Sequence, residues 1–228
     1  MQNRLRTCIR EWICERISER MPSSPSPRRK RARFSPVTRQ VFLYLFFLFP
    51  AVLDIAQGMA GALGPNPVSV CLHDFGRYAF RFLLASLVVT PLKRFLGVDI
   101  MLYRRPLGLL AFTYAALHVF FYVVVARQLD MHVLWKDFTS RPFLTFGILT
   151  FIILAVLAAT STRRAIRALG RKWAQLHKLV YVAMVLASIH YSIAFKTWHV
   201  EPFIYAALAL FVLALRLVPK QNRRKVGT

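Results

Sequence analysis

The sequence predicts an all-α polytopic membrane protein, a six-transmembrane-helix bundle with both termini in the cytoplasm. Composition is the first observation: 57% of the 228 residues are hydrophobic, yet the formal net charge is +23. A soluble domain would hardly combine so much charge with so much exposed apolar surface. A membrane protein can, because its charges gather in the loops. The other two observations are the lengths of the apolar segments and the charges between them.

Residues 1–38 are expected to form a basic, disordered N-terminal extension. Its stretch PSSPSPRRKRARFSP is rich in proline, serine and arginine, which is typical of disorder. A cleaved signal peptide is the rival interpretation. It is disfavoured because the first apolar run begins only at residue 41 and no clean A-x-A site follows a short apolar segment. A nucleic-acid partner would concern only this basic region, and we do not expect one.

Residues 39–218 are expected to form a six-helix transmembrane domain. A helix needs about 20 apolar residues to cross a bilayer, and most of the apolar segments reach this length, the last only just. The segments cover residues 41–63, 75–95, 107–127, 143–161, 173–195 and 202–218. The second is the poorest, because Arg77 and Arg81 interrupt its outer end.

Loop charge predicts the orientation of these segments. The connections 93–105 and 162–172 and the tail 219–228 are strongly basic, whereas the connections 128–142 and 196–201 are almost balanced in charge. Positively charged loops stay in the cytoplasm. Both termini, including the basic tail, are therefore expected on the cytoplasmic side.

Three histidines lie inside apolar segments, His118 in the third and His177 and His190 in the fifth. An ionisable residue within a membrane span is by default a candidate functional residue, and imidazoles from different helices suit haem iron. At a rise of 1.5 Å per residue, His118 lies about 14 Å and His190 about 9 Å from the outer ends of their spans. We therefore predict that His118 and His190 hold one haem toward the outer leaflet.

His177 is predicted to be a further haem ligand, close to the inner end of its span. On an ideal helix it would lie about 140° around the axis from His190. Two haems on one face of that helix would therefore need a bend, a bulge or different neighbouring helices. The inner site has no obvious second histidine, so its sixth ligand is open. For all three histidines the alternative is a hydrogen bond to a neighbouring helix.

Arg77 and Arg81 are one helical turn apart at the outer boundary, level with the predicted outer haem. Arginine pairs with carboxylates bidentately, so these two could bind the haem propionates. The alternative is that both reach out to the lipid headgroups. The chain has neither CxxC nor CxxCH, which argues against covalently attached c-type haem. Nucleotide-binding glycine motifs are absent as well.

Four stretches resemble a known family: HDFGRYAFRFLLASLVVTPL, RRPLGLLAFTYAALH, TSRPFLTFGI and TSTRRAIRALGRKWAQLHKLVYVAMVLASIHY. They are similar to the MsrQ (YedZ) family, the haem-binding membrane subunits of bacterial methionine sulfoxide reductase systems. The resemblance covers about residues 38–218. The W-x-x-L-H-x-x-V-Y run, followed by IHY, is its most specific part. The wider similarity is to the transmembrane domain of ferric reductases and NADPH oxidases.

The resemblance implies a bacterial inner-membrane protein with one or two b-type haems and FMN. Such a subunit passes electrons from the quinone pool, or from a cytosolic flavin reductase, to a periplasmic molybdopterin-containing methionine sulfoxide reductase. That partner repairs oxidised periplasmic proteins, so the chain itself would contain no catalytic residue for sulfoxide reduction. His118, His177 and His190 fall on the haem-associated histidines of the family.

Two alternatives belong to other functional classes. A ferric reductase or NADPH oxidase-like enzyme would have to borrow a flavin domain, because only residues 219–228 follow the last predicted span. A transporter or scaffold without haem would use its histidines to relay protons or to pack helices.

Overall fold

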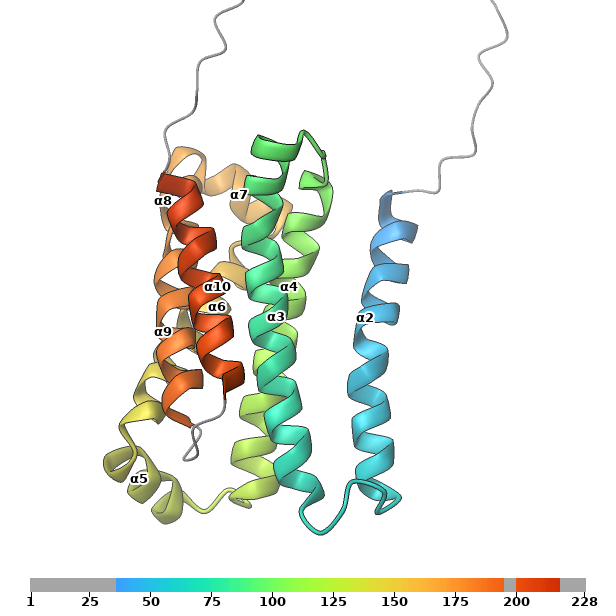
Figure 1. Ribbon diagram of the computed structural model, residues 1–228, viewed down its shortest axis with the longest axis vertical. Helices are drawn as coiled ribbons and strands as arrows, with labels where there is room; N and C mark the ends of the chain where they lie inside the picture. Colours follow the sequence, from blue (N-terminus) through green and yellow to red (C-terminus); the bar gives the residue numbers. More distant parts are fainter. Residues whose placement is uncertain (1–35, 195–199, 218–228) are drawn as a thin grey trace, which may run out of the picture. The chain divides into compact units, whose positions relative to one another are not determined.

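The computed structural model describes residues 36–194 and 200–217, and within these ranges all regular secondary structure is helical (Figure 1). The predicted all-α class is confirmed for this part of the chain. Contacts divide the chain into two units, Met1–Arg39 and Gln40–Thr228, and the description below concerns the second. The predictions for the extension, apart from its last residues at the start of a helix, and for the tail 219–228 lie outside the described residues.

The long helices coincide with the predicted apolar segments. They are α2 (Pro36–Met59), α3 (Pro67–Leu96), α4 (Met101–Phe120), α6 (Pro142–Ala159), α9 (Leu179–Ala194) and α10 (Val200–Leu217). A π-helix, η1 (Phe121–Ala126), continues α4. Short helices lie in the connections: α5 (Met131–Ser140), α7 (Arg163–Leu169) and α8 (Arg171–Leu176). Because α6 joins α5 to α7, these two short helices lie at its opposite ends (Figure 1).

Four of the described helical stretches are long and apolar enough to span a bilayer by themselves. They are residues 40–59, 101–126, 142–159 and 171–194. The helix α3 is not among them; it carries Arg77 and Arg81 within its first half and Lys93 and Arg94 in its last turn. The count of six spans therefore stays a prediction, as does their orientation.

Large apolar side chains cover much of the outer surface of the described helices. Phe46 of α2 is 73% exposed and Leu210 of α10 is 63% exposed. Exposed apolar surface of this extent is unusual in soluble proteins and is favourable in contact with lipid. The surface thus agrees with the membrane location that the composition predicts.

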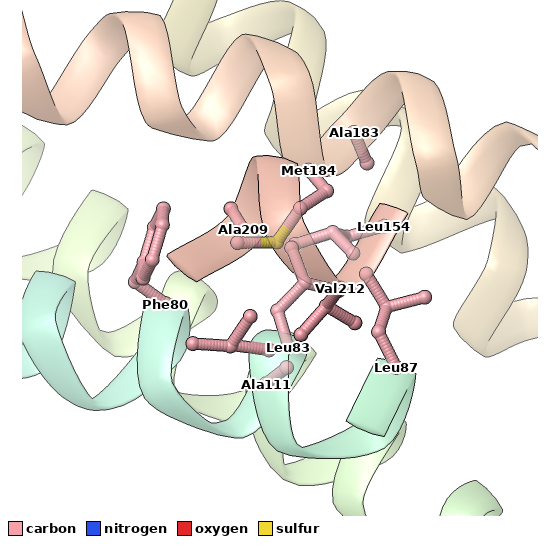
Figure 2. Packing of buried hydrophobic residues seen from close by; sticks show 10 residues of the cluster. Phe80, Leu83, Leu87, Ala111, Leu154, Ala183, Met184, Ala209 and Val212 are labelled. Carbon is pink, nitrogen blue, oxygen red and sulfur yellow. The ribbon is translucent and has the colours of Figure 1, made fainter. Parts of the chain in front are cut away.

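A common apolar core holds α3, α4, α6, α9 and α10 together. α3 packs along α4, α6 packs along α9, and α10 contacts both α9 and α3. Figure 2 shows the side chains at the centre of this packing: Phe80, Leu83, Leu87, Ala111, Leu154, Ala183, Met184, Ala209 and Val212. Ala111 and Ala183 are fully buried, and small residues at such positions let membrane helices approach closely. The helices that carry His118 and His190 are therefore fixed against one another.

The predicted fifth segment is broken rather than continuous. α8 ends at Leu176 and α9 begins at Leu179, so that His177 lies in the turn between them. The angle of 140° expected between His177 and His190 assumed one ideal helix. The turn at residues 177–178 interrupts that helix, so the angle of 140° does not apply to the observed structure.

Candidate functional site

The structure brings the rings of His118 and His190 together from α4 and α9. Their centroids are 6.2 Å apart and their planes are nearly perpendicular, at 86°. The two residues are separated by 72 positions in the sequence, so only the packing of α4, α6 and α9 can place them side by side. The pair is the centre of the candidate site.

Each of the two rings is oriented by a backbone carbonyl group of another helix. Nδ1 of His118 lies 2.8 Å from the carbonyl oxygen of Leu72 on α3, and Nδ1 of His190 lies 2.7 Å from that of Phe143 on α6. A carbonyl oxygen only accepts hydrogen bonds, so Nδ1 must carry the proton in both rings. In the neutral imidazole Nε2 then keeps its lone pair. Metal-binding histidines in proteins are held in the same way.

Two glycines allow the helices to approach these rings closely. A Cβ atom at Gly147 of α6 would lie 2.7 Å from Cε1 of His190, closer than atoms can approach without something moving. A Cβ atom at Gly76 of α3 would lie 3.1 Å from Nδ1 of His118. Both glycines are therefore part of the site, because any larger residue there would push on an imidazole.

A cavity of about 1240 Å³ surrounds the histidine pair. Its lining comes from α3, α4, η1, α5, α6 and α9 and is mostly apolar, with Phe80, Leu83 and Phe151 among the wall residues. This volume lies above the range of about 300–1,000 Å³ that is usual for small-molecule sites. The cavity is thus large enough for a bulky, mainly apolar cofactor.

The residues fit a haem held by two imidazoles. A metal–imidazole bond is about 2.0–2.1 Å long, so two such bonds to one ion place the ring centres about 6 Å apart. The observed separation of the centroids is 6.2 Å. Within the described residues, no group of three or more His, Cys, Asp or Glu side chains could bind a metal ion. The pair therefore suits a metal whose remaining ligands belong to the cofactor.

His177 lies in a different environment, about 20 Å from His190 if the rise of a helix is applied to the thirteen residues between them. Its ring stacks on Trp173 with centroids 4.0 Å apart, and its Nδ1 is 3.2 Å from the carbonyl oxygen of the same residue. Nε2 lies 3.4 Å from the hydroxyl of Ser161. His177 is not among the described residues that line the cavity. Its role as a haem ligand stays a prediction.

Arg77 and Arg81 have polar partners other than the histidine pair. Arg77 forms an ion pair of 2.7 Å with Asp74 and a longer one of 3.7 Å with Glu201 at the start of α10. Arg81 donates a hydrogen bond of 2.8 Å to the hydroxyl of Tyr205 and lies 3.5 Å from Glu201. Neither arginine is among the described lining residues of the cavity. Their predicted contact with haem propionates stays untested.

The sequence analysis missed another polar group that does line the cavity. Arg127 and Arg141 line it, and both pair with the buried carboxylate of Asp137 on α5. In the sequence these residues belong to the connection 128–142 and its edge, where opposite charges nearly cancel. The sequence analysis used this charge balance only to predict the orientation of the spans. It therefore did not consider that Arg127 and Arg141 could line a cavity.

Comparison with known proteins supplies independent information. The model of the family described as "Ferric reductase like transmembrane component" matches residues 75–188. The "Protein-methionine-sulfoxide reductase heme-binding subunit MsrQ" of Brucella anthropi is 42% identical over 184 residues, which are 80% of this chain and 84% of the relative. Proteins of the same description from Brucella ovis and Brucella canis are each 39% identical over 206 residues, 90% of this chain and 94% of the relative.

The sequence identity to these relatives and the geometry of the histidine pair are two separate observations. Both agree with the same family. The matched range 75–188 contains α4 with His118 and most of α9, and the longer matches to the relatives cover nine tenths of the chain. The chain belongs to the MsrQ family and contains a ferric reductase-like transmembrane component.

Proposed function

We propose that this protein is a haem b electron-transfer subunit of the bacterial inner membrane and that His118 and His190 would hold its haem iron. The observation that carries the proposal is the histidine pair, with ring centres 6.2 Å apart and each Nδ1 held by a carbonyl of another helix. The printed names of the relatives describe heme-binding subunits, in agreement with this assignment.

The residues of the chain position and shield the cofactor. The carbonyl groups of Leu72 and Phe143 fix the tautomer in which Nε2 of each ring can bind iron. The cavity wall around that position is mostly apolar, which suits the porphyrin ring. A haem iron held by two imidazoles has no open coordination position and supplies one-electron transfer rather than oxygen chemistry.

The partner and the direction of transfer follow from the chemistry of methionine repair. Methionine sulfoxide is restored only with reducing equivalents, and the periplasm is kept oxidising. Electrons would therefore cross the membrane from the quinone pool or a cytosolic flavin reductase to a periplasmic molybdopterin-containing methionine sulfoxide reductase. We propose six spans with both termini in the cytoplasm for this task, with residues 1–38 and 219–228 on that side.

A second haem and FMN complete the proposal. His177 is the candidate ligand of an inner haem, since it lies in the turn between α8 and α9, thirteen residues before His190. FMN is carried over from the family resemblance alone. The sequence predicts Arg77 and Arg81 as propionate ligands; because both pair with Glu201 and neither is among the described lining residues of the cavity, this contact stays an untested alternative.

Absorbance spectroscopy of the purified chain tests the haem assignment. We expect a Soret band that is lost or strongly reduced in His118→Ala and His190→Ala and unchanged in the control His132→Ala, whose side chain is exposed on α5. His177→Ala should lose at most one haem. Haem and flavin measured per polypeptide give the stoichiometry. A chain without a Soret band, or with a band unchanged in both ligand variants, would favour a transporter or scaffold.

A second candidate is a self-contained ferric reductase-like enzyme that borrows a flavin domain, and the family match to residues 75–188 favours it. The two functions differ in the electron acceptor. The reduced protein should deliver electrons to a periplasmic sulfoxide reductase much faster than to ferric chelates or oxygen. The reverse order of rates would support the ferric reductase.

A further inference from the structure

A buried carboxylate on α5 gathers two arginines and a tyrosine at the edge of the cavity. Asp137 is 6% exposed. Its Oδ2 lies 2.6 Å from Nε of Arg127, and its Oδ1 lies 3.1 Å from Nε of Arg141. The hydroxyl of Tyr122 donates a hydrogen bond of 2.7 Å to the same carboxylate. Four polar side chains thus form one connected group, defined here as the Asp137 cluster.

The Asp137 cluster carries an excess of positive charge. Two guanidinium groups face one carboxylate, which leaves one positive charge. Each arginine has five N–H donors, and the ion pairs engage Nε of each. Tyr122, Arg127 and Arg141 all line the cavity that contains His118 and His190. Donors and positive charge are therefore available on the wall of a cavity that is otherwise mostly apolar.

The π-helix η1 explains why Arg127 belongs to this wall. The backbone N–H of Arg127, the residue that follows η1, donates a hydrogen bond of 3.0 Å to the carbonyl oxygen of Tyr122, five residues earlier. In an α-helix the fifth residue along would lie about 140° around the axis. In η1 the guanidinium instead lies over the Tyr122 ring, 5.4 Å from its centroid. Tyr122 in turn follows His118 by four residues, which is one helical turn.

On this basis, and resting on the proposed haem ligation by His118 and His190, we propose that Arg127 and Arg141 bind the propionate carboxylates of that haem. The planar fork of arginine binds carboxylates bidentately, and such charge-assisted bonds are stronger than neutral ones. Asp137 is a positioning residue, because it holds both guanidinium groups at the cavity edge. Arg77 and Arg81, by contrast, pair with Glu201 and do not line the cavity in the described part of the chain.

The first test measures the rate of haem loss from the purified full-length protein to an excess of a haem-scavenging apoprotein. A hydrogen bond to a charged group contributes about 1.5–3 kcal/mol, so Arg127→Gln and Arg141→Gln should each lose haem roughly tenfold faster or more. Arg164→Gln, an exposed arginine on α7, is the matched control and should be unchanged. Arg77→Gln and Arg81→Gln form the competing arm and should also be unchanged.

The second test measures the reduction potential. If the residues had only a structural role, removal of a positive and of a negative charge would not shift the potential in opposite directions. Positive charge near the iron favours the reduced form, so Arg127→Gln and Arg141→Gln should lower the potential and Asp137→Asn should raise it. Arg141→Lys keeps the charge and loses the fork, so it should lose haem faster at a nearly unchanged potential. If Arg127→Gln is poorly folded by gel filtration, Arg141→Lys and Asp137→Asn decide.

The outcomes separate this proposal from the haem assignment itself. Normal haem loss and potential in the Arg127 and Arg141 variants, with an intact Soret band, would overturn the proposed propionate contact and leave the histidine ligands standing. Faster loss in Arg77→Gln and Arg81→Gln alone would move the contact to α3. A wild-type chain without a Soret band would instead refute the proposed ligation.

Discussion

His190 is held in a space that only glycine at position 147 leaves open. The edge of the ring faces α6. There the carbonyl oxygen of Phe143 accepts a hydrogen bond from Nδ1–H of His190, with 2.7 Å between the nitrogen and the oxygen. A Cβ atom at Gly147 would approach Cε1 to 2.7 Å and Nδ1 to 2.8 Å. A methyl group added at position 147 would therefore push α6, whose backbone orients the ring, away from His190.

Gly147→Ala should accordingly weaken haem binding. Overpacking of this kind costs about 1–3 kcal/mol, which corresponds to at least about a fivefold loss of affinity. The Soret absorbance per polypeptide and the rate of haem loss measure the effect. Gly108→Ala is the matched control, since a Cβ atom there has no neighbour within 4 Å. Equal haem content in the two variants would contradict the close packing of α6 on His190.

Gly76→Ala should have a smaller effect of the same kind. Its Cβ atom would lie 3.1 Å from Nδ1 of His118, a distance that a shift of a few tenths of an ångström relieves. We expect a haem content between those of Gly147→Ala and Gly108→Ala. A larger loss in Gly76→Ala than in Gly147→Ala would reverse the order of the two contacts and refute the geometry.

At the scale of elements, the start of α5 determines where Asp137 lies. The side chain of Asp130 caps this helix by accepting hydrogen bonds from the backbone N–H groups of His132 and Val133, at 2.9 and 3.1 Å. α5 has only ten residues, and so short a helix is marginal without such a cap.

Asp130→Ala should loosen α5, because loss of an N-cap costs about 1 kcal/mol. Hydrogen exchange of the His132 and Val133 amides should become faster, and haem should be lost more rapidly if the Asp137 cluster binds it. Asp130→Ser retains a capping oxygen and should stay close to wild type. Unchanged amide exchange in Asp130→Ala would show that other contacts fix the helix.

The break between α8 and α9 is tied to the end of α6 by Trp173. Its indole N–H donates to the carbonyl oxygen of Thr160 at 3.1 Å, while its ring stacks on His177. Carbonyl groups at a helix end have no partner within their own helix. Trp173 therefore supports both the end of α6 and the position of His177.

Trp173→Phe should lower the thermal midpoint of the detergent-solubilised protein by about 2–4 °C, because one hydrogen bond contributes about 1 kcal/mol in a chain of this size. Trp135→Phe serves as control, since Trp135 of α5 is 68% exposed. Equal midpoints of the two variants would refute the role of the indole N–H.

The proposed function requires an orientation in which electrons leave on the outer side of the membrane. Cysteine labelling tests this orientation in a chain without its native cysteines. Ser140→Cys, exposed in α5, should react with a membrane-impermeant maleimide in intact spheroplasts. Arg164→Cys, exposed in α7, should react only after permeabilisation. The opposite pattern would invert the predicted topology and place the histidine pair toward the cytoplasm.

Much of the fold could be read from the sequence because it depends on local hydrophobicity. A span is a run of apolar residues, and the predicted segments 107–127 and 143–161 differ from the observed helical stretches by only a few residues. Local periodicity could not foresee η1 or the break at His177, since both depend on contacts with other helices. The predicted segment 75–95 and residues 202–217 of the last predicted segment are helical, but within the described residues neither qualifies as a span by length and composition.

By itself the sequence determined the helical class, and it predicts the direction of the chain through the bilayer and the histidines of the candidate site. These properties follow from the cost of placing charge and unpaired imidazole in hydrocarbon, which each segment bears on its own. The pairing of His118 with His190 was predicted from their depths, but only the tertiary structure decided that Leu72 and Phe143 orient them and that Arg127 rather than Arg77 lines the cavity. The physical reason is that such contacts join residues on different helices, and their distances depend on helix packing, which no single segment encodes.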